Sequence, residues 1–198
     1  MHLAPRQTGW IEVITGCMFS GKTEELLRRL RLARYARQST VVFKPHLDTR
    51  YSATHVVSHD DSQMESHAVQ DAHEIMPLVK TGQVVGIDEG QFFGLNLVDV
   101  CEELANAGHR VIVSGLDQDF RGQPFEPIPQ LMAVAEYVTK NLAICMKCGN
   151  PADRSQRLVN REARFLVGAA DMYEARCRRC FVAEKPGDVQ EPLPLPRK

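Results

Sequence analysis

Short apolar runs alternate with longer amphipathic stretches over the first two-thirds of the chain. Four runs rich in β-branched residues have the length and composition of buried strands. They are WIEVIT at 10–15, TVVFK at 40–44, VVGIDEGQFF at 84–93, whose apolar part stops at two carboxylates, and RVIVSGL at 110–116. Because helical patterns stand between them, the sequence predicts right-handed βαβ units and a mainly parallel sheet flanked by helices.

Two of the intervening segments, 22–37 and 97–108, have the period of helices packed against a sheet. In the first, one face carries the apolar residues Leu26, Leu27, Leu30 and Ala33. The same segment predicts i,i+4 ion pairs at two places, Glu24 with Arg28 and Glu25 with Arg29. In the second, Gly108 follows the last apolar position and predicts the helix end.

Residues 45–72 are polar and irregular, which predicts a long mobile loop or lid. Histidines stand in or beside this segment at 46, 55, 59, 67 and 73. A metal cluster is one interpretation of these histidines. Since they are spread through a polar stretch, we expect them to be solvated instead.

The character of the chain changes near residue 140, where two Cys-x-x-Cys pairs stand on short extended pieces. We therefore expect an α/β domain at 1–140 and a small cysteine-bearing domain at 141–182. The last residues, 183–198, are polar and rich in proline, which predicts a disordered tail.

Basic and acidic side chains nearly balance, at 24 and 25, and leave a net charge of −1 over 198 residues. A nucleic-acid-binding domain usually carries an excess of positive charge. No apolar run approaches the ~18 residues of a membrane span, and the N-terminus lacks the apolar run of a signal peptide. We therefore expect a cytoplasmic protein that binds neither nucleic acid nor membranes.

The stretch GCMFSGKT matches the phosphate-loop motif G-x-x-x-x-G-K-[ST] at Gly16, Gly21, Lys22 and Thr23. In such a loop the backbone N–H groups and the helix N-terminus hold a polyphosphate. The lysine reaches the outer phosphates and the threonine binds Mg²⁺. A plain glycine turn before a basic helix is the alternative, but the strand before and the helix after the motif favour the phosphate loop.

Two adjacent carboxylates, Asp88 and Glu89, follow the apolar run that begins at residue 84. A strand-end aspartate holds Mg²⁺ in P-loop enzymes, which predicts that role for Asp88. Glu89 is then placed to take a proton from an attacking hydroxyl or water. The alternative is a solvated turn, which a position directly after a buried strand disfavours.

Four of the six cysteines form the pattern C-x₂-C…C-x₂-C, at Cys145, Cys148, Cys177 and Cys180. Four thiolates predict a closed structural Zn²⁺ site with no open position for chemistry. The metal would join the two ends of segment 149–176. The other two cysteines, Cys17 and Cys101, are expected to be ordinary buried thiols.

These motifs together resemble the thymidine kinase family that has a P-loop domain and a zinc-bearing lasso, the cytosolic type shared by bacteria and animals. The resemblance covers about residues 10–182. Besides the four cysteines, it depends on GCMFSGKT, DTRYS at 48–52, GIDEGQFF at 86–93, GLDQDFRGQPF at 115–125 and VGAADMY at 167–173.

The resemblance implies ATP-dependent phosphorylation of the 5′-hydroxyl of thymidine, with Glu89 as the catalytic base. It places ATP and Mg²⁺ on Gly16, Cys17, Met18, Phe19, Ser20, Gly21, Lys22, Thr23, Arg50, Asp88 and Gln91. Arg50 would approach the transferring phosphoryl group.

The resemblance also implies a nucleoside pocket. Its walls would be Met18, Phe92, Leu116, Phe120 and Phe125. The lasso would cover the base through main-chain groups of Arg164, Phe165, Leu166, Val167 and Gly168, with Tyr173 on the sugar. Cys17, where proline or serine is frequent, and the segment GAAD depart from the common family pattern without touching a catalytic position.

As further implications of the resemblance, we expect a homotetramer inhibited by thymidine triphosphate. Two other functions compete with the kinase: a zinc-ribbon P-loop ATPase acting on nucleic acid, and a non-catalytic zinc-ribbon interaction module. The charge balance disfavours the first, and the second leaves the phosphate loop unexplained. Treating the phosphate loop as independently packed, we expect zinc loss to raise the KM for thymidine much more than the KM for ATP.

Overall fold

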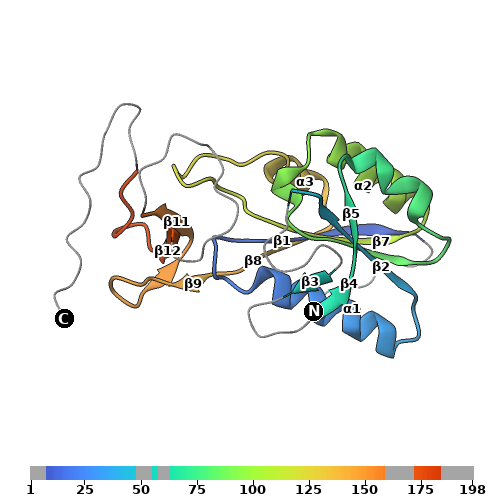
Figure 1. Ribbon diagram of the computed structural model, residues 1–198, viewed down its shortest axis with the longest axis horizontal. Helices are drawn as coiled ribbons and strands as arrows, with labels where there is room; N and C mark the ends of the chain where they lie inside the picture. The colour runs from blue at the N-terminus through green and yellow to red at the C-terminus, as the bar shows by residue number, and fades with distance from the viewer. Residues whose placement is uncertain (1–7, 48–54, 58–62, 159–171, 184–198) are drawn as a thin grey trace.

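Six parallel strands form the central sheet of the computed structural model, which describes residues 8–47, 55–57, 63–158 and 172–183 (Figure 1). The strands are β1 (Trp10–Thr15), β2 (Thr40–Pro45), β5 (His67–Val69), β6 (Val84–Ile87), β7 (Arg110–Gly115) and β8 (Tyr137–Lys140). Their order across the sheet is β5-β2-β6-β7-β1-β8, and every neighbouring pair is parallel. The predicted parallel sheet is confirmed.

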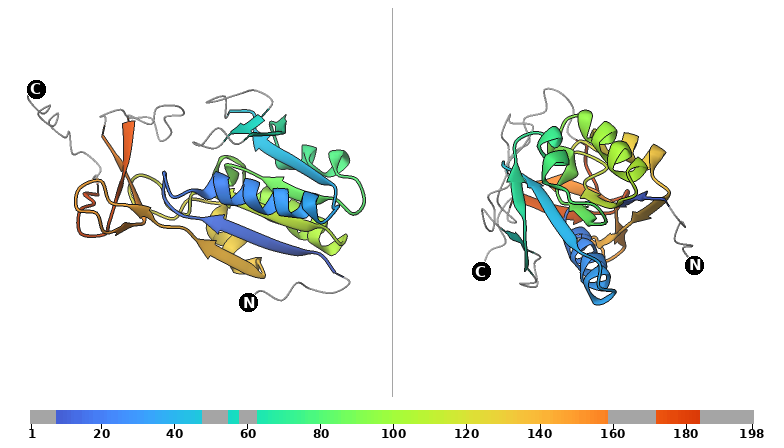
Figure 2. Two further views of the ribbon diagram at one scale, coloured as in Figure 1. Left: turned by 90° about the horizontal axis from the view of Figure 1, so that it is seen from below. Right: turned by 90° about the vertical axis from the view of Figure 1, so that its right-hand side faces the viewer.

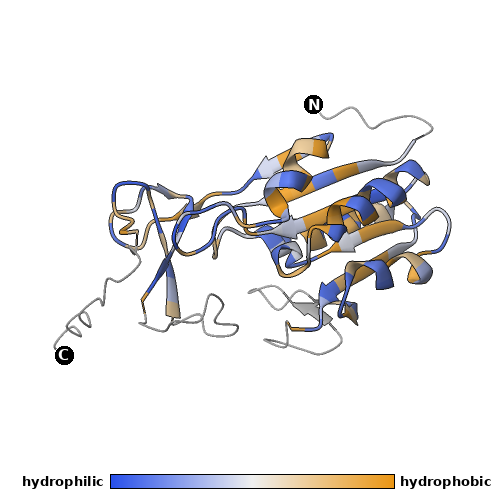
Figure 3. Cartoon of the chain, turned by 90° about the horizontal axis from the view of Figure 1, so that it is seen from above, coloured by the Kyte–Doolittle hydropathy of each residue, from blue (hydrophilic) through white to orange (hydrophobic). Residues whose placement is uncertain are grey.

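Helices cover both faces of this sheet, α1 on one side and α2 and α3 on the other (Figures 1 and 2). Their bounds are α1 (Lys22–Tyr35), α2 (Asn96–Asn106) and α3 (Ile128–Val134). Successive strand residues point to opposite faces. Val13 and Val113 therefore pack beneath α2 and α3, whereas Ile14 and Ile112 pack against α1. Figure 3 shows hydrophobic residues in the strands and alternating with hydrophilic residues along the helices.

The apolar face predicted for α1 is confirmed, since Leu26, Leu27, Leu30 and Ala33 are all buried. Its predicted ion pair between Glu25 and Arg29 forms, with Nε and Oε1 2.7 Å apart. The predicted pair of Glu24 with Arg28 is wrong, because Arg28 binds Glu25 at 2.6 Å. The Glu24 carboxylate instead lies beside Gly21, at the positive end of the helix dipole.

The prediction of one long loop over residues 45–72 is also wrong. Strands β3 (His55–Val57) and β4 (Gln63–Glu65) form an antiparallel pair, and β5 joins the central sheet beside β2. Strand β5 is short and has little apolar periodicity, so its pairing with β2 defines it. The stretches 48–54 and 58–62 lie outside the described residues.

Single 3₁₀ turns connect the larger elements: η1 (Ala72–Glu74), η2 (Met76–Leu78) and η3 (Gly90–Phe92). In the part of the chain that the structure describes, no helix has the length and apolar character that crossing a bilayer requires.

A C-terminal unit, formed by residues 141–158 and 172–183, projects from one end of the sheet (Figure 2). It contains β9 (Ala143–Ile144), β10 (Pro151–Ala152), β11 (Arg154–Arg157) and β12 (Tyr173–Arg176). Strands β9 and β10 form one small antiparallel sheet, and β11 and β12 form another. The unit follows β8 directly, which places it beyond the carboxyl ends of the parallel strands. The predicted tail, 183–198, lies outside the described residues apart from its first residue.

Candidate active site

The glycine-rich loop joins the carboxyl end of β1 to the start of α1, where it exposes backbone N–H groups and the helix N-terminus. Three of its residues have positive φ, Gly16 at 140°, Phe19 at 65° and Gly21 at 74°. A Cβ on Gly16 would lie 2.2 Å from the carbonyl oxygen of Asn141, so the close approach of these two backbones requires glycine. The predicted loop therefore has the conformation and position of an anion site.

Lys22, the lysine of the motif, folds back across this loop. Its Nζ donates a hydrogen bond to the carbonyl oxygen of Cys17 at 2.7 Å. Burial lowers the pKa of Lys22, and the nearby charges of Glu89, Asp88 and Asp117 oppose that shift. A cation thus faces several carboxylates from the ends of β6 and β7.

Asp88 lies directly opposite the loop at the end of β6. Its carboxylate accepts hydrogen bonds from the Thr23 hydroxyl, at 3.2 Å, and from the Ser114 hydroxyl, at 2.7 Å. Mg²⁺ prefers hard oxygen ligands of this kind. Thr23 and Asp88 together therefore form a donor set that suits the ion.

Glu89 adopts a left-handed backbone conformation, with φ 52° and ψ 41°. A left-handed backbone conformation costs free energy for a residue other than glycine. Residues with this strain are found preferentially at functional sites. Gln91 holds the side chain, because its Nε2 donates to Glu89 Oε2 while its Oε1 accepts from the Leu116 N–H at 2.9 Å. Gln91, which we expected on the ATP side, thus links Glu89 to the chain that follows β7.

Aromatic side chains predicted to line the nucleoside pocket come together from separate loops. The rings of Phe92 and Phe125 meet edge to face, with centroids 6.3 Å apart. Phe120 and Tyr173 are both buried, and the guanidinium of Arg157 touches both. Sequence reasoning missed Arg157, because only the tertiary structure brings β11 beside residue 120.

The remaining predicted pocket residues are placed as follows. Met18 lies in the phosphate loop, and Leu116 follows the end of β7. Arg50 and the predicted main-chain contacts at 164–168 lie outside the described residues.

The phosphate loop is tied to the C-terminal unit, so our expectation that it packs independently is wrong. The Cys17 thiol donates to the carbonyl oxygen of Ala152 at 3.4 Å, and the Met18 N–H donates to Ser155 Oγ at 3.0 Å. Cys17 also belongs to an apolar cluster with Ala143, Cys145, Ala152, Ala175 and Cys177. The linear sequence gives no signal for this contact, because it joins residues far apart in the chain.

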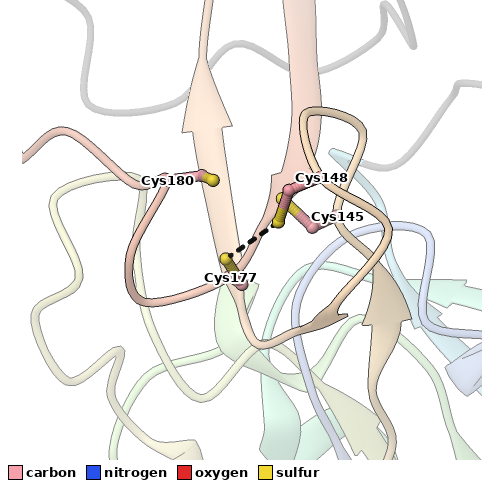
Figure 4. Close-up of side chains that lie close together, drawn as sticks. All are labelled: Cys145, Cys148, Cys177 and Cys180. Carbon is pink, nitrogen blue, oxygen red and sulfur yellow. Dashed lines mark hydrogen bonds between the residues drawn. The ribbon is translucent and has the colours of Figure 1, made fainter.

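The four predicted metal ligands converge between two turns of the C-terminal unit (Figure 4). All four Sγ atoms lie within 4.8 Å of one another, and those of Cys148 and Cys177 are 3.6 Å apart. Tetrahedral Zn²⁺ with Zn–S bonds of about 2.3 Å separates its sulfurs by about 3.8 Å, so the cluster fits the ion.

The pKa values of the four thiols differ: two are lowered, whereas that of Cys180 is raised to about 12, chiefly through its hydrogen bond with Cys148. Burial favours the neutral thiol of Cys145, but hydrogen bonds from the surrounding backbone and from Cys148 outweigh it and lower its pKa to about 6. Cys177 likewise has a lowered pKa because the Cys180 N–H stabilises its thiolate. By contrast, burial raises the pKa of Cys17 and of Cys101, which are the buried neutral thiols that we expected.

The fold and site define a P-loop nucleotide-binding protein with an appended cluster of four cysteines that could hold a metal ion. A sequence model of the thymidine kinase family matches residues 9–181, and the chain belongs to that family.

Two thymidine kinases are close relatives. That of Rhodothermus sp. (strain ITI 518) is 62% identical over 178 residues, which are 90% of this chain and 84% of that protein. That of Bdellovibrio bacteriovorus is 56% identical over 177 residues, which are 89% and 87% of the two chains.

Among solved structures, the genome packaging NTPase B204 from Sulfolobus turreted icosahedral virus 2, in complex with ATP-gammaS, gives a TM-score of 0.44 at 14% identity. The matched region covers 70% of this chain and 76% of the NTPase chain.

Proposed function

We propose that this protein transfers the γ-phosphoryl group of ATP to the 5′-hydroxyl of thymidine and releases thymidine monophosphate. The observation that carries the proposal is 62% identity to a thymidine kinase over 90% of this chain. The geometry agrees with this activity. The phosphate loop contacts Asp88 at the end of β6, and the next residue, Glu89, is held by a hydrogen bond from Gln91. Phosphoryl transfer needs mainly positioning and charge neutralisation, which these groups supply.

On the donor side, the N–H groups of residues 16–23 would bind the ATP phosphates. Lys22 would exchange its bond with the Cys17 carbonyl for a charge-assisted bond to an outer phosphate. Thr23 and Asp88 would hold Mg²⁺, which neutralises charge on the phosphates when bound. Arg50 would approach the phosphoryl group in transfer.

On the acceptor side, Glu89 would remove the proton of the 5′-hydroxyl as the oxygen attacks phosphorus. Gln91 keeps the Glu89 carboxylate in a fixed direction, so little reorganisation is needed at that moment. The thymidine itself would lie in a pocket formed by Met18, Phe92, Leu116, Phe120, Phe125, Tyr173 and the main chain of residues 164–168.

We further propose a kinase domain at 1–140, a zinc-binding lasso domain at 141–182 and a tail at 183–198. Support for the first boundary is the end of β8 at Lys140, after which the small sheets of the C-terminal unit begin. Zn²⁺ on the four cysteines would join both ends of the lasso and reduce the entropy lost when it orders.

Loss of zinc is expected to affect both substrates. In Cys177→Ser one ligand of the cluster is lost, and the apolar cluster that contains Cys17 loosens with it. We therefore expect KM to rise at least about fivefold for ATP as well as for thymidine. Steady-state kinetics on protein with measured zinc content checks this result.

Cys101→Ala is the matched control, because Cys101 is buried on the inner face of α2 and belongs to a different apolar cluster from the metal-binding cysteines. It should lower the melting temperature slightly and leave both KM values within about twofold of wild type. An unchanged KM for ATP in folded, zinc-depleted Cys177→Ser would refute the link between the phosphate loop and the metal site.

We also propose a cytoplasmic homotetramer that thymidine triphosphate inhibits, as the family resemblance implies. Use of four thiols in one metal cluster suits a reducing compartment. Large exposed apolar side chains, Tyr35 on α1 and Leu142, Ile144 and Met146 near β9, are available for contacts between subunits. Light scattering with and without the triphosphate measures the assembly directly.

The proposed activity is tested by supplying labelled ATP to a panel of nucleosides, with single-stranded DNA as a possible activator. We expect thymidine monophosphate as the main product and no stimulation by DNA. Free phosphate released in response to DNA, with no nucleotide product, would instead support a nucleic-acid-dependent ATPase.

A further inference from the structure

Arg157 is a buried arginine at the end of β11, and its side chain bridges the two parts of the molecule. Only 2% of its surface is exposed, although an arginine is rarely buried without a specific role. In the antiparallel pair of β11 and β12, Arg157 stands directly opposite Tyr173. It is therefore fixed by the register of the C-terminal unit.

The guanidinium of Arg157 contacts two side chains at once. Its Cζ lies 3.5 Å from the centroid of the Phe120 ring, within the range of a strong cation–π contact. Its Nη2 donates a hydrogen bond to the Tyr173 hydroxyl at 3.1 Å. Phe120 belongs to the loop after β7, so Arg157 joins that loop to strand β12 of the C-terminal unit.

We propose that Arg157 is a positioning residue for the nucleoside pocket, which fixes Phe120 and Tyr173 relative to each other. The inference depends on the proposed function, because it takes Phe120 and Tyr173 as walls of the thymidine site. The two side chains that Arg157 contacts, Phe120 and Tyr173, both belong to the proposed nucleoside pocket and not to the phosphate loop. Removal of Arg157 should therefore weaken nucleoside binding and spare the binding of ATP.

The planar guanidinium matters for this role as well as its charge. One face of the plane covers the aromatic ring while an N–H in its edge reaches the hydroxyl, a combination that a lysine ammonium cannot reproduce. Arg157→Lys therefore keeps the charge and the aliphatic stem but loses one of the two contacts.

The test compares steady-state kinetics of purified Arg157→Met, Arg157→Lys and wild type, with melting temperature and zinc content measured for each. We expect Arg157→Met to raise the KM for thymidine about tenfold and Arg157→Lys about threefold. The KM for ATP should stay within about twofold in both variants. A residue that only stabilised the fold would not raise the KM for thymidine while leaving the KM for ATP unchanged.

Arg154→Met is the matched control on the same strand. Arg154 bonds Gln118 and Asp153 and contacts neither Phe120 nor Tyr173 in the described structure. It should leave the KM for thymidine within about twofold of wild type. The double variant Arg157→Met with Tyr173→Phe should raise the KM for thymidine by less than the product of the two single effects. Both substitutions remove the same hydrogen bond, between Arg157 and the Tyr173 hydroxyl.

An unchanged KM for thymidine in folded Arg157→Lys and Arg157→Met would overturn the inference, as would equal increases for thymidine and ATP. If Arg157→Met does not fold, Arg157→Lys decides by the same criterion. Failure of wild-type protein to phosphorylate or bind thymidine would instead overturn the proposed function, so the two failures are distinguishable.

Discussion

Replacement of Glu89 by glutamine is expected to lower kcat about 100-fold or more while thymidine binding changes little. Glutamine has nearly the same shape and still offers an oxygen to the Gln91 amide, which donates to Glu89 in the native site. What it loses is the ability to accept the proton of the attacking hydroxyl. Pre-steady-state kinetics with calorimetric measurement of thymidine affinity separates these two effects.

Glu103→Gln is a suitable control, because Glu103 is exposed near the C-terminal end of α2 and is none of the predicted site residues. Its kcat should equal that of wild type. Near-normal turnover in Glu89→Gln, with the fold intact, would remove Glu89 from the role of base and direct attention to another carboxylate near Lys22, such as Asp117.

Replacement of Lys22 by alanine should damage both ATP binding and turnover. The ammonium that now bonds the Cys17 carbonyl is the cation within the phosphate loop, and its charge would be needed more as the phosphoryl group transfers. We expect ATP to bind at least about tenfold more weakly and kcat to fall about 100-fold. Calorimetry with a non-hydrolysable ATP analogue measures the first effect and steady-state kinetics the second.

Lys80→Ala provides the comparison, since Lys80 is an exposed lysine between η2 and β6. It should bind the ATP analogue with wild-type affinity. If Lys22→Ala also kept that affinity, the assignment of residues 16–23 as the phosphate site would have to be abandoned.

The sequence predicts four of the six strands of the central sheet, β1, β2, β6 and β7, because their signals are local, whereas the two edge strands β5 and β8 were not predicted. Strands such as β1 and β7 are buried on both faces, so they consist of nearly continuous apolar residues. The phosphate loop can also be predicted from the sequence, because its glycines, lysine and threonine lie within one stretch of the chain, residues 16–23. The metal ligands also come as two local pairs, and the fold then brings all four thiols together.

What the sequence could not predict depends on contacts between distant segments. Strand β5 forms because it pairs with β2, and its own sequence has no strong strand signal. The contact of Met18 with Ser155 and the position of Arg157 over Phe120 follow from the docking of the C-terminal unit. Each of these features is decided by tertiary packing, which leaves no periodic pattern in the chain.

The central claim, that the phosphate loop and the surrounding carboxylates transfer phosphate from ATP to thymidine, has one most direct test. Phosphorus NMR of a single reaction containing the full chain, ATP, Mg²⁺ and thymidine identifies every phosphorus-containing product. The account predicts ADP and thymidine 5′-monophosphate in equal amounts, with phosphorus bonded to the 5′ oxygen. ADP accompanied by inorganic phosphate, with thymidine unchanged, would contradict it.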